Sequence, residues 1–181
     1  MPFRYPSGPD IGPGLTEAGE RLVKRCNELG ILIDLSHMNE AGFRDIARLS
    51  TAPLVATHSN AHAICPHARN LTDEQLRIIA DSDGMVGLNF ATAFLRPDGR
   101  MIPDVAFETM LRHLDHLIGI LGETRVGLGS DYDGAVMPEA LATAAGLPAL
   151  QDAMRRHGYD DGLQRRLMCD NWLSALGRVW H

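Results

Sequence analysis

The chain has 181 residues, of which 45% are hydrophobic and 22% are charged, as is ordinary for a globular domain with a substantial core. Its formal net charge is −6, and its 17 basic residues are scattered, which argues against nucleic acid or an anionic membrane surface as a partner. No apolar stretch has the length of a membrane-spanning helix, and the opening MPFRYPSGPD does not have the pattern of a signal peptide. We therefore expect a cytoplasmic protein.

Short apolar runs alternate with helical patterns after an irregular lead-in over residues 1–13. The runs predict buried strands at 31–35, 54–57, 84–89 and 125–129. Helices are predicted at 17–29 after a Thr16 cap, at 40–49 after an Asn39 cap, from the capping box 72–75 to about 80, from 103 to about 121, at 147–157 and from 160 to about 180. A long polar loop covers 59–70. This alternation predicts right-handed βαβ units and a parallel sheet.

Polar side chains with metal-binding chemistry follow three of the predicted strands. His37 and His58 each end an apolar run beside small hydroxyl residues, and Asp131 follows the run at 125–129. Because the carboxyl ends of parallel strands meet at one edge, we expect these side chains to converge. Two histidines and a carboxylate are a ligand set of hydrolytic metal centres. The alternative for each histidine is a hydrogen-bonded loop residue.

Five segments in order resemble the membrane (renal) dipeptidase family of zinc peptidases, which are amidohydrolase-like TIM barrels. They are GLTEAGERLVKRCNELGILIDLSHMN, THSNAHAICPHARNLTDEQL, GMVGLNF, RVGLGSDYDG and CDNWLSALGRVW, and they cover nearly the whole chain from Gly14. The resemblance implies an α/β fold that is the C-terminal half, strands five to eight, of a (β/α)8 barrel. Residues 14–181 would then form a partial dipeptidase-like metal hydrolase domain after the lead-in.

The resemblance also implies roles for individual residues. His37 and His58 correspond to two histidine ligands of zinc, of which the complete family site holds two ions. Arg69 corresponds to the arginine that holds the carboxylate of a dipeptide substrate. Asp131 corresponds to the aspartate that handles the proton, and the nearby Asp133 is the second candidate for that role.

Family members carry an H-x-D pair and a bridging glutamate ahead of the segment seen here, and we expect that the few residues before Gly14 cannot supply them. We therefore expect this chain alone to bind zinc weakly and to be a poor dipeptidase. One alternative is a catalytically inactive binding or assembly module, and another is a hydrolase of other amides or esters. Bare edges at strands 31–35 and 125–129 would favour a homodimer or pairing with a missing N-terminal half.

Several other residues have simpler interpretations. His62 and His67 are interpreted as loop residues, and His113 and His116 as part of an amphipathic helix face rather than as metal ligands. The alternative for Arg69 is a surface ion pair with Asp73. Packing contacts are expected for Asn171 and Trp172, and buried free thiols are expected for Cys26, Cys65 and Cys169, which lack metal-type spacing.

Overall fold

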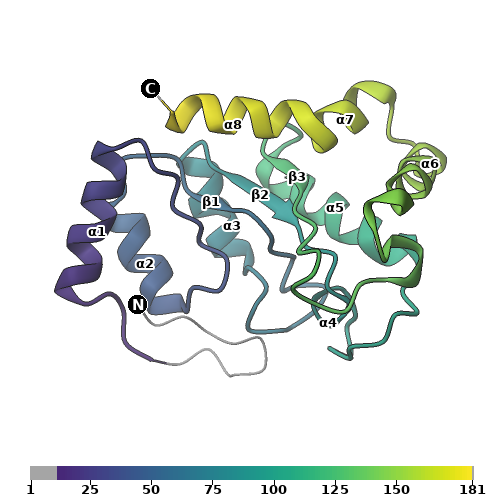
Figure 1. The fold of residues 1–181 in the computed structure, drawn as a ribbon, viewed down its shortest axis with the longest axis horizontal. Helices are drawn as coiled ribbons and strands as arrows, with labels where there is room; N and C mark the ends of the chain where they lie inside the picture. Colours follow the sequence, from purple (N-terminus) through teal and green to yellow (C-terminus); the bar gives the residue numbers. More distant parts are fainter. Residues whose placement is uncertain (1–11, 181) are drawn as a thin grey trace.

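A parallel sheet of three strands lies at the centre of the fold. The computed structural model describes residues 12–180, so most of the predicted lead-in lies outside the described residues. The strands β1 (Val55–Ala56), β2 (Met85–Leu88) and β3 (Val126–Leu128) are hydrogen-bonded in the order β1-β2-β3 (Figure 1). Val86 pairs with Ala56 on one side and with Val126 on the other. Three of the four predicted strands are therefore confirmed as parallel strands.

The fourth prediction, a strand at 31–35, is wrong. This segment reaches the sheet only through an isolated parallel bridge between Asp34 and Val55. The Leu35 N–H donates to the Val55 carbonyl over 2.8 Å, but the Thr57 N–H donates to the Asp34 side chain over 2.9 Å. Because the carboxylate of Asp34 takes that backbone donor, the ladder ends after one bridge.

The predicted helices are present, with local differences at their ends. They are α1 (Glu17–Glu28), α2 (Glu40–Leu49), α3 (Asp73–Asp81), α5 (Phe107–Leu121), α6 (Leu147–His157), α7 (Asp161–Arg165) and α8 (Asn171–Val179). The predicted caps Thr16 and Asn39 each accept a backbone N–H, and Thr72 and Gln75 form the predicted capping box.

The helical elements also depart from prediction in four places. Helix α5 begins at Phe107, not at the predicted position 103, where the Pro103 carbonyl accepts bonds from the backbone N–H groups of Val105 and Glu139. A short buried helix α4 (Thr92–Leu95) lies in a predicted loop. Two short 3₁₀ helices, η1 (Glu139–Leu141) and η2 (Ala144–Gly146), precede α6, and a π-helical turn, η3 (Arg166–Asp170), divides the tail helix.

The two faces of the sheet pack against different helices. Val86, Leu88 and Val126 belong to the main core together with apolar residues of α3 and α5. Successive side chains of a strand point to opposite faces, so Val55 and Met85 lie on the other face of the sheet. There they form a second cluster with Ala175 and Trp172 of α8. A Cβ at Gly127 would lie 2.6 Å from the Trp172 ring nitrogen, so this position needs glycine for the indole to approach. Figure 1 shows α8 running along the sheet on this side.

The free edge of β3 is partly satisfied by α8, which corrects the expectation of a bare edge. The Asn171 side chain donates to the Val126 carbonyl over 2.7 Å, and the Trp172 ring N–H donates to the Leu128 carbonyl over 2.9 Å. These carbonyls would otherwise be open to another strand. The predicted packing role of Asn171 and Trp172 is confirmed.

All three cysteines are free, but their burial differs from the expectation. Cys65 is buried, Cys26 is half-buried and Cys169 is exposed on the π-helical turn. None of the helices between residues 12 and 180 combines the length and apolar character needed to cross a lipid bilayer.

Candidate metal and substrate site

His37 and His58 lie together at the carboxyl edge of the sheet. Their ring centroids are 5.3 Å apart and the rings are tilted by 56°. His58 comes two residues after β1, while His37 follows the segment that bridges to β1. His37 has a positive φ of 68°, a left-handed conformation that is uncommon for a residue with a Cβ and is often found at functional sites.

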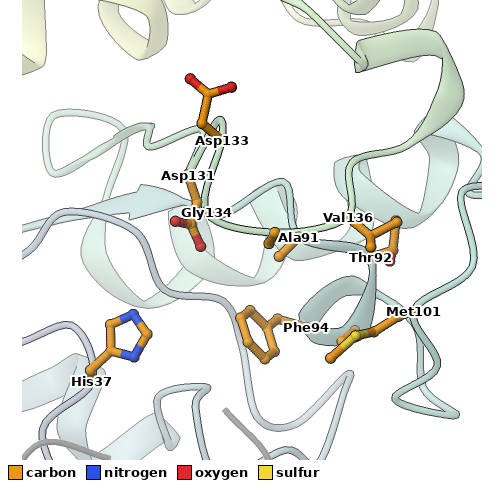
Figure 2. Close-up of a pocket in the computed structure, with 11 residues that line it drawn as sticks. His37, Ala91, Thr92, Phe94, Met101, Asp131, Asp133, Gly134 and Val136 are labelled. Atoms are coloured by element: carbon orange, nitrogen blue, oxygen red, sulfur yellow. The ribbon is translucent and has the colours of Figure 1, made fainter. Parts of the chain in front are cut away.

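Asp131 faces the same region from the end of β3. Its Oδ2 accepts a hydrogen bond of 3.0 Å from the Asn89 side chain at the end of β2. The Asn89 side chain also donates to the His58 carbonyl over 3.3 Å, so it joins the ends of all three strands. Asp131 has a φ of 60°. Asp131 is half-buried, whereas Asp133, which lines the same cavity, is exposed and its carboxylate points away from that of Asp131 (Figure 2).

A hydrogen-bonded chain runs from Asp34 through Thr57 to His58. The Thr57 hydroxyl donates to Asp34 Oδ2, and Thr57 Oγ1 lies 2.7 Å from His58 Nδ1. Asp34 Oδ2 itself is 3.7 Å from His58 Nδ1, which is too long for a direct hydrogen bond. Burial alone would raise the pKa of Asp34, but hydrogen bonds from Thr57 and Ser36 outweigh it and lower the pKa below its ordinary value.

The electrostatics favour a neutral imidazole at His58. Its pKa is lowered first by burial and then by the positive charge of Arg69, although Asp34 and Asp131 act in the opposite direction. A neutral ring is the form that binds a metal ion.

Arg69 is buried beside His58, which contradicts its interpretation as a surface arginine paired with Asp73. Its guanidinium donates to the Ser59 hydroxyl over 2.7 Å and to the His58 carbonyl over 2.6 Å. Within the described part of the chain its Nε has no hydrogen-bond partner. Burial lowers the pKa of Arg69 to about 10, despite the charges of Asp34 and Asp131. Asp73 instead bonds to His116 over 2.8 Å.

A cavity of about 550 Å³ opens between His37 and Asp131. Figure 2 shows the Asp131 carboxylate turned toward the side where His37 lies. Phe94, Met101 and Val136 give the cavity an apolar part. This volume falls in the range of small-molecule sites, which is roughly 300–1,000 Å³. Arg69 does not line the cavity, but its guanidinium carbon lies 5.7 Å from the centre of the Phe94 ring.

Within residues 12–180, no further histidine completes a three-ligand group with the pair. His113 is buried, where its ring bonds to the Ala61 N–H over 3.2 Å and to the Leu95 carbonyl over 3.0 Å. The triplet His113-Leu114-Asp115 has the H-x-D pattern, but it lies in α5, where Asp115 bonds to Tyr159 and His157. His67 packs on Phe94, with the ring centroids 4.9 Å apart.

Zinc fits the chemistry of this site only in part. Two imidazoles are suitable ligands, but residues 12–180 contain no group of three histidine, cysteine, aspartate or glutamate side chains placed to hold a metal ion. His37 and His58 would therefore supply two ligands of an incomplete set.

The structure adds two residues, Asp34 and Asn89, that sequence reasoning did not select. The only sequence indication was a polar side chain within an apolar run, as for Asp34, or at its end, as for Asn89.

A parallel α/β sheet with histidines and a carboxylate at its carboxyl edge is an arrangement found in metal-dependent hydrolases. The family described as membrane dipeptidase, peptidase family M19, matches residues 7–181, and the chain belongs to this family. The resemblance identified from sequence is thus confirmed.

Two solved structures and a curated relative are similar to this chain over nearly its whole length. A metallo peptidase from Rhodobacter sphaeroides, crystallised with a phosphinate mimic of the dipeptide L-Ala-D-Ala, is 63% identical with a TM-score of 0.94, over 98% of this chain and 51% of its own. A second structure, dipeptidase AC, is also 63% identical with a TM-score of 0.94, over 99% of this chain and 53% of its own. An uncharacterized protein in the pqqA 5′ region of Klebsiella pneumoniae is 54% identical, over 97% of this chain and 65% of the relative. The chain spans about half the length of these solved relatives.

Proposed function

We propose that this chain carries part of the active site of a zinc-dependent dipeptidase, with His37 and His58 as zinc ligands. The observation that carries the proposal is the pairing of the two imidazoles, 5.3 Å apart, beside a cavity that Asp131 also lines. The three strands and the Asp34 bridge would correspond to strands five to eight of a (β/α)8 barrel. The family membership and the dipeptide mimic bound to the Rhodobacter sphaeroides relative support a dipeptide as substrate.

Asp131 is proposed to move the proton. Zinc supplies Lewis acidity for the scissile carbonyl and increases the acidity of a water molecule. A carboxylate at this point can accept the proton of the attacking water and return it to the departing amine. The bond from Asn89 holds the Asp131 carboxylate toward the cavity, whereas the exposed Asp133 has no such bond among the described residues. This difference favours Asp131 over Asp133.

Arg69 is proposed to attract the carboxylate of the dipeptide. Its charge is buried, and among the described residues no carboxylate forms an ion pair with it. A guanidinium is suited to bind a carboxylate through parallel N–H donors. The apolar wall of Phe94, Met101 and Val136 would then receive a small side chain of the substrate.

The test is zinc titration of the purified chain combined with hydrolysis of L-Ala-D-Ala. We expect weak zinc binding that is lost in His37→Ala and in His58→Ala, and little turnover, because two histidines are fewer ligands than a catalytic zinc site uses. His62→Ala is the matched control and should leave zinc binding unchanged. Zinc binding that ignores both histidines would refute the proposed site. Tight binding of two zinc ions with fast turnover would refute the argument from ligand number.

A catalytically inactive binding module is the second candidate, favoured by the lack of a three-ligand group among residues 12–180. It predicts that the chain binds the phosphinate dipeptide mimic in the absence of zinc and does not hydrolyse L-Ala-D-Ala. In that case Arg69→Lys should weaken binding of the mimic, whereas His58→Ala should not.

A further inference from the structure

The hydrogen bonds around Thr57 have a defined direction. Asp34 Oδ1 accepts the backbone N–H groups of Ser36 and Thr57, each over 2.9 Å, and Asp34 Oδ2 accepts the Thr57 hydroxyl. An ionised carboxylate has no proton to donate. The single hydroxyl proton of Thr57 therefore points to Asp34.

This direction determines the proton position on His58. Thr57 Oγ1 lies 2.7 Å from His58 Nδ1 and has already given its proton to Asp34, so it can only accept from the ring. His58 Nδ1 must then carry the proton, and Nε2 carries the lone pair. Among the described residues no hydrogen bond is made to Nε2.

We propose that Asp34 and Thr57 are positioning residues that hold neutral His58 as the Nδ1–H tautomer, so that Nε2 is the metal-binding nitrogen. The inference rests on the proposed function only in assigning zinc to Nε2. The tautomer itself is a property of the metal-free chain. The backbone N–H of His58 also donates to the Ser36 hydroxyl over 3.0 Å. The segment that contains Asp34 and Ser36 therefore holds both the backbone and the ring of His58.

The substitution Asp34→Asn makes the sharpest test because it should reverse the chain. The two backbone N–H groups require an acceptor at the Oδ1 position, so the oxygen of the new amide stays there and its NH₂ group faces Thr57. The NH₂ then donates to Thr57 Oγ1, and the Thr57 hydroxyl turns to donate to His58 Nδ1. His58 must become the Nε2–H tautomer, which cannot bind a metal through Nε2.

The experiment is a long-range ¹H–¹⁵N correlation spectrum of the histidine side chains in the zinc-free full chain above pH 7, with the His58 signals assigned from His58→Gln. We expect Nδ1–H in the wild type and Nε2–H in Asp34→Asn. Thr57→Ser keeps the hydroxyl and should keep Nδ1–H, whereas Thr57→Val should lose the preference. Asp45→Asn is the matched control, since Asp45 also accepts a backbone N–H, from Leu15 over 2.8 Å, but lies away from His58.

Zinc affinity gives a second measurement. Loss of an orienting partner of a metal-binding histidine typically weakens metal binding by roughly 10–100-fold, and we expect this range for Asp34→Asn. A wild-type His58 in the Nε2–H form, or an unchanged tautomer in a folded Asp34→Asn, would overturn the proposal. If the His58 tautomers behave as expected but no variant changes the zinc affinity, the inference about the tautomer stands and the proposed zinc site fails.

Discussion

Asn89 connects to Asp131 by a hydrogen bond of 3.0 Å between side chains that are 42 residues apart in the sequence. Asn89 is fully buried, and its oxygen accepts the Ala91 N–H over 2.6 Å. Its own N–H donates to the Asn60 side chain over 2.8 Å. One amide thus aligns the proposed proton carrier with the loop that follows β2.

Asn89→Ala should destabilise the fold as well as release Asp131. The substitution leaves the buried Ala91 N–H without its acceptor, which costs about 1–3 kcal/mol in the free energy of unfolding. Urea unfolding measures this change. Asn27→Ala in α1, where the half-buried side chain accepts one bond from Ser50, is the control and should cost less than Asn89→Ala. Equal losses in the free energy of unfolding for the two variants would show that the hydrogen bonds of Asn89 contribute no more stability than the single bond of Asn27.

A pair of glycine substitutions tests the contact between β3 and α8. Gly127→Ala places a methyl group 2.6 Å from the Trp172 ring nitrogen, so the indole must shift. We expect a loss of about 1–3 kcal/mol from overpacking. Gly119→Ala in α5 meets no atom within 4 Å and should stabilise the helix by up to about 1 kcal/mol. Thermal unfolding compares the two, and a neutral Gly127→Ala would contradict the tight packing.

His113 should make stability depend on pH. Its pKa is lowered to about 4, mainly because the ring is buried, although the bond to the Leu95 carbonyl raises it. Unfolded histidine binds a proton below about pH 6.5 while folded His113 does not, so the free energy of unfolding falls as pH decreases from there toward about 4, by roughly 3 kcal/mol.

The measurement for His113 is urea unfolding across this pH range. His113→Gln should be less stable than the wild type at pH 7 but should lose less stability on acidification. A His113→Gln curve parallel to the wild-type curve would contradict the prediction.

Self-association stays a prediction. The carbonyls of β3 that do not bond to β2 accept hydrogen bonds from α8. On the other side of the sheet, Ile31 is 49% exposed, three residues before the single bridge at Asp34. Exposed apolar surface at a short sheet edge favours association. Sedimentation velocity at micromolar concentration should show a dimer or larger species, reduced by Ile31→Lys and unaffected by Met101→Lys. A wild-type monomer would show that the remaining edge does not associate.

The sequence by itself was sufficient for features that depend on neighbouring residues. The caps at Thr16 and Asn39 and the box from Thr72 to Gln75 each join residues three apart, so local pattern identifies them. Three buried strands were recognisable as apolar runs, and the family resemblance was carried by ordered motifs. The expectation that His37 and His58 converge followed from parallel topology and is matched by the 5.3 Å between their rings.

Only the tertiary structure decided how the ends of the strands are joined. The bond from Thr57 to Asp34 spans 23 residues and the bond from Asn89 to Asp131 spans 42, and no local pattern specifies such partners. The same contacts explain the failed strand at 31–35, because a side-chain carboxylate there competes with the sheet for a backbone donor. Apolar periodicity measures the tendency of a segment to be buried. Which of its polar groups pair across the fold depends on distances that exist only once the chain has folded.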